Sequence, residues 1–367
     1  MRKLLDKKLG PSLPLLGFIL GSCSSFGGEH SSQDLKNYSA SGSYNQESQR
    51  FENQNQDLID PMKDKVFSFN FITKLIFPPD NLRPPGPLPE KHIDFQAFLQ
   101  PSTSAKLIWL GHSSFLVRMA EKTILIDPVF FNAGPFFFLG RRFQPSIVRV
   151  EDLPPVDYIV ISHDHFDHLE MRTAQYFAQM KTQFIVPLGV RTHLTYWGVP
   201  EQNIIERDWW GSHRDGELEV ILTPSRHYSG RSGFLANDTL WGSFVIRDTH
   251  SSIYYSGDSG YDSHFKDIAQ RYGPFQIALV ENGQYHEISR QIHLFPEDTL
   301  QAFKDLNAQT LVPIHWGMFA LSQHPWDEPI KTINQLASEH GIDLYMPKLG
   351  EIFSTQRPRT LERWWEP

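Results

Sequence analysis

The chain has 367 residues, of which 40% are apolar, enough for a sizeable core in one large domain or two small ones. Its formal net charge of −8 argues against a nucleic-acid partner, because such a partner requires a basic protein face. A substrate phosphate stays open, since bound metal ions can supply positive charge locally. Cys23 is the single cysteine, which excludes an intrachain disulfide and a cysteine metal ligand in the fold.

The N-terminus has the pattern of a bacterial lipoprotein signal peptide over residues 1–23. Basic residues precede an apolar run at 13–20, which is too short for a transmembrane helix of ~20 residues. Leu20-Gly21-Ser22-Cys23 then has the form of a lipobox with Cys23 as the lipidated residue; the alternative is an unmodified thiol. Because Ser24 rather than Asp follows, we expect a lipid anchor in the outer membrane of a bacterial cell envelope, with the protein facing the periplasm.

Residues 24–60 are rich in Ser, Gln, Asn and Gly and poor in branched aliphatic side chains. Such a segment buries too little apolar surface to order itself, so we predict a disordered tether. The composition becomes globular at about Pro61, and residues 61–367 are expected to form the folded domain.

Strand and helix patterns interleave along this domain. Runs of β-branched and aromatic residues bounded by Gly, Pro, Asp or His predict strands at 106–110, 114–118, 123–127, 158–162, 184–187, 218–223, 241–246, 252–256, 277–280 and 310–314. Helical patterns occupy 169–180, 189–197, 261–271, 296–306 and 328–339. This order predicts an α/β or α+β class, with two mixed sheets packed together and helices outside them.

The densest group of metal-type side chains is the stretch 162–168, Ser-His-Asp-His-Phe-Asp-His, directly after the apolar run 158–161. Imidazole nitrogens and carboxylate oxygens suit a borderline cation such as zinc. Alternate side chains of an extended segment point the same way, so His163 and His165 can bind one ion. Asp167 and His168 lie past the strand end and would face a second ion, as in two-metal sites with ions roughly 3.5–4 Å apart. The alternative is a surface turn that binds nothing.

Metal-type residues also follow other apolar strands, at Asp127, His227, Asp258 and His315. Each is weak alone, because a single His or Asp at a strand end is more often a cap or a hydrogen-bonded loop residue. Their recurrence after buried strands indicates an active site, since such sites gather at one edge of a sheet.

Taken together, these residues resemble the dinuclear site of the metallo-β-lactamase superfamily. Further motifs are similar to its group of N-acyl-phosphatidylethanolamine-hydrolysing phospholipases D, among them Trp109-Leu110-Gly111-His112-Ser113, Gly257-Asp258-Ser259-Gly260-Tyr261 and Ile314-His315-Trp316-Gly317. The resemblance spans roughly residues 107–353 and implies a four-layer αββα sandwich of the metallo-β-lactamase type. The lipobox and the tether are not part of it.

The resemblance also implies individual roles. One zinc ion would be bound by His163, His165 and His227, the other by Asp167, His168 and His315, with Asp258 bridging both. Asp127 would hydrogen-bond a ligand histidine from behind, its alternative being a turn residue before Pro128. A metal-bridging hydroxide would attack phosphorus, with Asp167 helping to orient the water. Manganese or iron stays open as the native metal.

Two loops carry tentative substrate contacts. The segment 281–287 departs from the phospholipase pattern where a substrate loop is expected, so the resemblance does not imply a preference for acyl amides. Gln284 and Tyr285 are the tentative substrate residues of this segment. His293 matches a histidine of that group and could donate a proton to the leaving group or bind phosphate; a plain loop histidine is the alternative.

Phenylalanines crowd the stretch 130–138. Core packing is one interpretation, and an apolar rim that touches lipid beside the site is the other. In the second interpretation Phe136 and Phe137 contact acyl chains and Arg141 contacts a lipid phosphate.

The sequence therefore predicts a dinuclear metal-dependent hydrolase, a phosphodiesterase of phospholipase D type that acts on N-acyl-phosphatidylethanolamine-like phospholipids or another small diester. One alternative is a lactonase or ester hydrolase of the same fold, and another is a zinc-binding envelope protein without turnover. An oxidoreductase is rejected, since di-iron members of the fold typically carry Glu in place of His165 and lack His168. The oligomeric state is left open.

Overall fold

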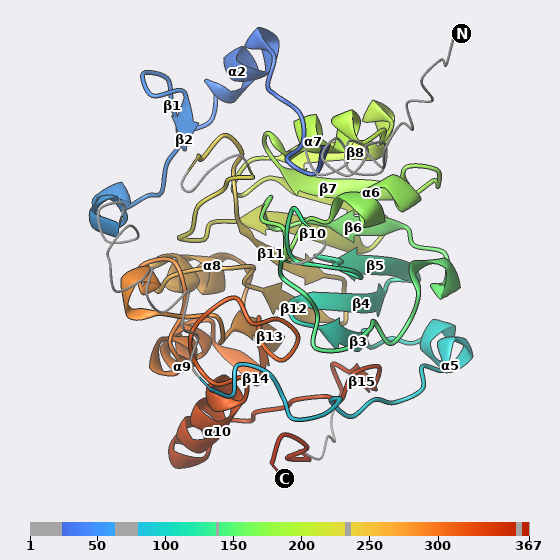
Figure 1. Ribbon diagram of the computed structural model, residues 1–367. Helices are drawn as coiled ribbons and strands as arrows, with labels where there is room; N and C mark the ends of the chain where they lie inside the picture. Colours follow the sequence, from blue (N-terminus) through green and yellow to red (C-terminus); the bar gives the residue numbers. More distant parts are fainter. Residues whose placement is uncertain (1–23, 63–79, 137–138, 232–235, 357–361, 367) are drawn as a thin grey trace, which may run out of the picture.

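The computed structural model describes residues 24–62, 80–136, 139–231, 236–356 and 362–366. Two mixed sheets lie face to face with helices on their outer sides, which confirms the predicted αββα sandwich (Figure 1). The predicted signal peptide at 1–23 lies outside the described residues. Within the described part of the chain, no helix combines the length and the apolar character needed to cross a bilayer.

The first sheet has the strand order β15-β3-β4-β5-β6-β7-β8, antiparallel from β15 to β5 and parallel from β5 to β8. Helices α6 and α7 follow β6 and β7 as crossovers between parallel strands. The elements on this side are α5 (Phe95–Leu99), β3 (Lys106–Gly111), β4 (Ser114–Met119), β5 (Lys122–Ile126), β6 (Tyr158–Val160), α6 (Met171–Phe177), β7 (Gln183–Pro187), α7 (Val190–Tyr196), β8 (Ile204–Arg207) and β15 (Ile352–Ser354).

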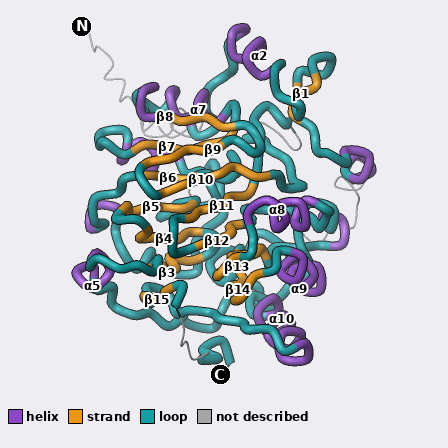
Figure 2. Tube along the Cα trace, turned by 180° about the vertical axis from the view of Figure 1, so that it is seen from behind, coloured by secondary structure: helices purple, strands orange, loops and turns teal. Residues whose placement is uncertain are grey.

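The second sheet has the order β14-β13-β12-β11-β10-β9, with parallel pairing among β12, β13 and β14. Figure 2 shows its helices α8, α9 and α10 grouped beside β13 and β14. The elements are β9 (Ser212–Asp215), β10 (Leu218–Thr223), β11 (Ser243–Arg247), β12 (Ser252–Tyr255), α8 (His264–Tyr272), β13 (Phe275–Glu281), α9 (Pro296–Asp305), β14 (Ala308–Ile314) and α10 (Glu328–His340). Single 3-10 turns occur at Gln56–Leu58, Asp60–Met62, Val150–Asp152, Glu201–Asn203 and Glu287–Ser289.

Strand β3 shows why the central strands are continuous apolar runs. Leu107 and Trp109 belong to the large core cluster that includes residues of both sheets. Ile108 and Leu110 face the other way, into the cluster that the first sheet shares with α6 and α7. A strand buried on both faces needs apolar residues at every position rather than an alternation. The continuous apolar run therefore predicts β3 from the sequence.

The predicted tether is wrong for residues 24–60. The segment forms α2 (Ser32–Tyr38), β1 (Tyr44–Asn45) and β2 (Arg50–Phe51), and Ser31 caps α2 with a reciprocal bond to Asp34. Composition misled the prediction, because a few aromatic side chains supply the burial that branched aliphatics would otherwise give. Tyr38, Tyr44 and Phe51 all belong to the large core cluster. The folded unit therefore begins before the boundary predicted at residue 61.

Three strands were missed at the sheet edges: β8, β9 and β15. They are short, and β9 is polar throughout and half-exposed, so no apolar run announces it. Edge strands of this kind are common in natural sheets, where polar side chains discourage pairing with other chains.

Candidate metal centre

The predicted site residues, together with His112, come from strand ends at one edge of the two sheets. His112 follows β3, Asp127 follows β5, and His163 lies just beyond β6. On the second sheet, Asp258 lies just past β12 and His315 directly follows β14. Because the sheets face each other, loops far apart in the sequence meet at this edge, as expected for a packed α/β architecture.

One cluster consists of three imidazoles. Nδ1 of His165 lies 2.8 Å from Nε2 of His163 and 3.2 Å from Nε2 of His227. Asp258 completes the group, with Oδ2 at 3.9 Å from Nε2 of His163 and 3.7 Å from Nε2 of His227. The ligand atoms of all four side chains lie within 4.8 Å of one another.

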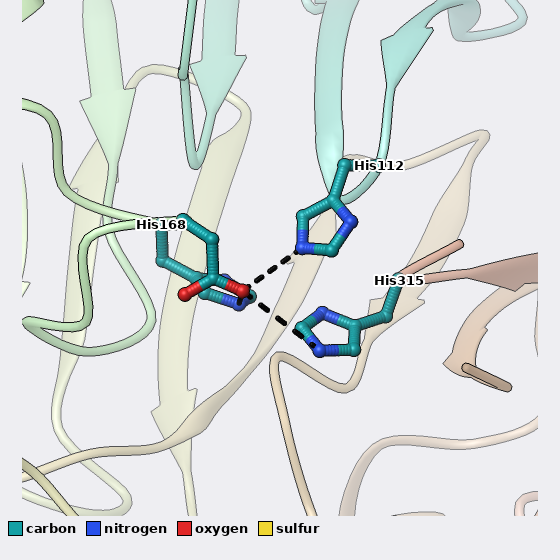
Figure 3. Close-up of side chains that lie close together, drawn as sticks. His112, His168 and His315 are labelled. Carbon is teal, nitrogen blue, oxygen red and sulfur yellow. Dashed lines mark hydrogen bonds and ion pairs between the residues drawn. The ribbon is translucent and has the colours of Figure 1, made fainter. Parts of the chain in front are cut away.

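A second cluster lies beside the first and contains Asp167, His168, His315 and also His112. Oδ2 of Asp167 lies 3.0 Å from Nε2 of His112, 3.5 Å from Nε2 of His168 and 3.9 Å from Nε2 of His315. Figure 3 shows the three labelled imidazoles approaching one another from separate loops.

Asp258 joins the two clusters. Its Oδ2 faces the first, while Oδ1 lies 3.2 Å from Nε2 of His168 and 3.0 Å from Nδ1 of His315. Gly257 has φ +56°, and a Cβ at this position would lie 2.8 Å from the Gly242 carbonyl oxygen. A glycine is therefore needed directly before Asp258 for the loop to pass so close to its neighbours.

Hydrogen bonds on the far side of the rings fix where the protons lie. The Ser162 hydroxyl donates to Asp127, so its oxygen accepts from Nδ1 of His163 at 2.9 Å. Nδ1 of His227 lies 2.9 Å from the Ile292 carbonyl oxygen, which can only accept. In both rings the proton lies on Nδ1, and the Nε2 lone pair faces the cluster.

Asp127 has the contact predicted for it. Its Oδ2 lies 2.7 Å from Nδ1 of His168, and it also accepts hydrogen bonds from Ser162 and from the hydroxyl of Tyr255. Asp127, His112 and His315 have left-handed backbone conformations, with φ of 38°, 55° and 66°. Non-glycine residues rarely adopt this region, and such strain gathers at functional sites.

Burial and neighbouring charges prepare the side chains for a cation. Burial lowers the pKa of His163, His165 and His227, so these imidazoles are neutral at pH 7. Burial alone would raise the pKa of Asp258, but the imidazoles of His168 and His315 hold it well below its usual range.

The same balance applies to the second cluster. Burial would raise the pKa of Asp167, but His168 and His112 hold it well below its usual range. Burial would lower the pKa of His168, yet Asp258, Asp167 and Asp127 together raise it well above its ordinary value. The cluster therefore favours a positive charge at this point, whether a proton or a metal ion.

The donor atoms fit metal ions. Tetrahedral zinc with bonds of about 2.05 Å to nitrogen places its ligand atoms roughly 3.3 Å apart, close to the separations among His163, His165 and His227. The Nε2 lone pairs of His163 and His227 both face Nδ1 of His165, which can donate its proton to them or, once deprotonated at Nδ1, bind a cation together with them. In the second cluster, the buried Nε2 of His168 and Oδ1 of Asp258 face each other at 3.2 Å without the alignment of a hydrogen bond, which leaves room for an ion to bind both atoms.

A cavity of about 500 Å³ opens over the clusters. Its walls combine the ligands His165, Asp167, Asp258 and His315 with other polar groups and with an apolar set. Gln284 and His293, both predicted near the substrate, line it, as do Phe26, Ala133, Phe166, Tyr228, Gly230, Arg231 and Leu321.

Of the remaining tentative substrate residues, those in the described part of the chain are absent from the cavity walls. Tyr285 is buried, hydrogen-bonds Glu328 and stacks on His324, which makes it a packing residue. Arg141 is exposed and lies in a short β-bridge with Asn132. Phe136 is half-buried outside the cavity walls, and Phe137 lies outside the described residues.

Three residues of the site were not assigned a role from the sequence. His112 belongs to the motif after β3, but a single histidine there carried no weight. Glu281 ends β13 and forms a short contact with Nδ1 of His293. Asn53, in the presumed tether, bonds both the backbone NH and the carbonyl of His227, at 3.0 and 2.8 Å. A signal for Glu281 existed, because this acidic residue directly follows the apolar run 277–280.

Comparison with known proteins agrees with this geometry. The pattern of the beta-lactamase superfamily domain matches residues 122–316, which include most of the ligands. An uncharacterized protein of Mycobacterium tuberculosis is 38% identical over 264 residues, 70% of each chain. The chain belongs to the beta-lactamase superfamily.

Two further similar proteins are informative. The mitochondrial N-acyl-phosphatidylethanolamine-hydrolyzing phospholipase D of Saccharomyces cerevisiae is 32% identical over 260 residues, which are 66% of this chain and 54% of the yeast protein. Igni18, a metallo hydrolase from the archaeon Ignicoccus hospitalis KIN4/I, has a TM-score of 0.55 at 22% identity, covering 70% of this chain and 100% of its own. The second likeness shows a shared fold. Together with the two clusters, membership in the beta-lactamase superfamily supports a metal-dependent hydrolase.

Proposed function

We propose that this chain is a dinuclear zinc hydrolase that cleaves the phosphodiester bond of N-acyl-phosphatidylethanolamine-like phospholipids. One observation carries the proposal: two ligand clusters share the carboxylate of Asp258 in the wall of a cavity of about 500 Å³. The first ion would be held by His163, His165 and His227, and the second by Asp167, His168 and His315. The 32% identity to the yeast phospholipase supports the choice of substrate class.

The ions, when bound, would activate a water molecule and polarise the phosphoryl oxygen. The chain's own residues orient and shuttle protons around them. The carboxylate of Asp167 is anionic, borders the cavity and accepts from His112 at 3.0 Å, so it can also orient the attacking water.

His293 is placed to serve the leaving group. It lines the cavity, and its Nδ1 is held by the buried carboxylate of Glu281. Glu281 is itself fixed by the backbone NH of Ser259, which donates to Oε2 at 2.7 Å. This arrangement presents the other ring nitrogen for proton transfer to a departing alkoxide, as an oriented histidine does in general acid catalysis.

Membrane attachment is a second part of the proposal. We retain the lipid anchor at Cys23 and the outer-membrane location that the lipobox predicted. The residues that follow Cys23 are docked on the domain, because Trp197 donates to the Ser24 carbonyl at 2.7 Å and Arg231 donates to that of Ser25. An anchor before this segment would hold the protein by the face that carries the cavity. Loss of radiolabelled fatty-acid incorporation and of membrane pelleting in Cys23→Ser would support it; unchanged pelleting would contradict it.

The substrate proposal is tested with the purified zinc-loaded protein. Vesicles that contain N-acyl-phosphatidylethanolamine are incubated with it, and an N-acyl homoserine lactone serves as the alternative substrate. Attack of water on phosphorus breaks the bond to the head-group alcohol, so free head-group alcohol and lipid phosphate should appear in equal amounts. Lactone opening without diester cleavage would favour the lactonase alternative, and zinc binding without either reaction would favour the envelope protein without turnover.

A further inference from the structure

The segment directly after Cys23 reaches the cavity of the metal centre. Phe26 is one of the cavity-lining residues. Its ring meets the ring of Phe166 edge-on, with centroids 5.9 Å apart and planes at 88°. Phe166 lies between His165 and Asp167, one from each ligand cluster. The two rings form an apolar ledge beside both clusters.

Arg231 holds this segment in place. It is buried, and Nε and Nη2 donate to the Ser25 carbonyl at 2.9 and 2.7 Å. Nη1 donates to the carbonyls of Asp164 and Leu169, which flank the ligand loop. The guanidinium carbon also lies 4.0 Å from the centroid of the Phe166 ring. One side chain therefore fixes the N-terminal segment to the loop that carries the ligands.

Two glycines let the segment lie against α7. Gly27 has φ +88°, and a Cβ there would lie 2.1 Å from Nδ1 of His193. A Cβ on Gly28 would lie 2.7 Å from the Thr192 carbonyl oxygen. A larger residue at either position would have to lift the segment, because the buried ring of His193 and the backbone of α7 are closely packed. The position of Phe26 is therefore fixed by contacts on either side of it: Arg231 binds the Ser25 carbonyl before it, and Gly27 and Gly28 pack against α7 after it.

We propose that Phe26 is a specificity-determining residue, which with Phe166 binds an apolar ester substituent of the substrate. Residues 24–30 lie outside the matched family domain at 122–316, whereas Phe166 lies within it. This inference rests on the proposed function, because the specificity is that of the proposed phosphodiester hydrolysis. The ledge itself requires only that ligands with apolar groups enter the cavity.

The test compares two diesters with the same leaving group, methyl p-nitrophenyl phosphate and phenyl p-nitrophenyl phosphate. In Phe26→Ala, kcat/KM for the phenyl ester should fall about tenfold, while that for the methyl ester stays within about twofold. Gly27→Ala should give the same split, because it displaces Phe26 without removing it. Phe26→Leu keeps an apolar side chain and should lose about threefold or less.

Gln33→Ala is the matched control, since Gln33 is exposed on the same N-terminal segment and its side chain donates to Asn37 within α2. It should change neither ester. Equal losses on both esters in Phe26→Ala would show that the segment acts through stability alone and would overturn the proposal. Unchanged kinetics in both Phe26→Ala and Gly27→Ala would overturn it as well.

A binding measurement separates this proposal from the proposed function. If no diester is hydrolysed, the proposed function fails, and calorimetry with phenylphosphonate and methylphosphonate then tests the ledge. The wild type should bind phenylphosphonate about tenfold more tightly, and Phe26→Ala should remove that preference. A wild type without the preference, or a variant that keeps it, would overturn the proposal.

Discussion

The Asp127 carboxylate lies 2.7 Å from Nδ1 of His168, while Nε2 of the same ring lies 3.2 Å from Asp258. The His168 imidazole thus contacts a carboxylate through each of its ring nitrogens. Such a contact behind a ligand histidine fixes its orientation and raises its basicity toward a metal.

Asp127→Asn should therefore weaken metal binding by about 10–100-fold, since a neutral amide is a poorer acceptor for the imidazole NH. The left-handed backbone at this position suits asparagine, so the fold should persist. Competition with a chromophoric chelator measures the affinity. Tyr255→Phe removes another partner of Asp127 but keeps the carboxylate, and it should cost less; equal losses in the two variants would contradict the assigned role.

Asn53→Ala tests whether the N-terminal segment is part of the folded unit. The substitution leaves the backbone NH and carbonyl of His227 without their buried partners, which should cost about 3 kcal/mol of unfolding free energy. Urea unfolding followed by circular dichroism gives the value. Asn55→Ala, which removes a bond to Asp262 at an exposed site, should stay within about 0.5 kcal/mol. Equal stability of the two variants would contradict this account and favour a disordered segment.

His293→Gln tests the proton donor through the leaving group. With an alkyl leaving group, kcat should fall about 100-fold, because the alkoxide needs a proton as it departs. With p-nitrophenolate, which leaves without one, the loss should be threefold or less. Glu281→Gln should follow the same pattern in weaker form. A loss that is independent of the leaving group would mean that His293 acts in another way.

Acid should destabilise the fold through His264. Burial lowers the pKa of this histidine to about 3, below its unfolded value of 6.5, so the unfolded state binds the proton first. Stability from the neutral ring is complete above pH 6.5 and is lost as pH falls toward 3. Between pH 7 and 5 the loss should be about 2 kcal/mol.

The matched comparison for this pH effect is His264→Gln. Glutamine has no group that titrates in this range. The unfolding free energy of the variant should therefore fall by about 2 kcal/mol less than that of the wild type over the same pH interval. Parallel pH profiles of the two proteins would contradict the account. His264 contacts Ser259, which follows the ligand Asp258, so both proteins are compared in the same metal-free state.

Much of the fold could be predicted because its central strands are buried on both faces. Strand β10 was predicted with the bounds that it has, since six buried residues in succession leave no ambiguity. Strand β9 could not be found, because its side chains alternate between exposed and half-exposed. The segment 24–60 was misjudged because its order depends on partners such as Arg231, more than 150 residues away in sequence.

The candidate ligands could be predicted from local sequence, because they follow apolar strands and the strand ends meet at one edge of the sheets. His163, Asp258 and His315 all carried that signal. The cavity walls carried none. Phe26 faces the site because two glycines and an arginine place it there, a relationship that only the tertiary structure reveals.

The central claim is that hydrolysis depends on two metal ions at the clusters joined by Asp258. The direct test is to measure metal content and phosphodiester turnover on the same samples, before stripping with a chelator and during stepwise return of zinc. We predict about two ions per chain, with turnover that vanishes and returns in step with the metal. Full turnover in samples that hold fewer than about half an ion per chain would contradict the claim.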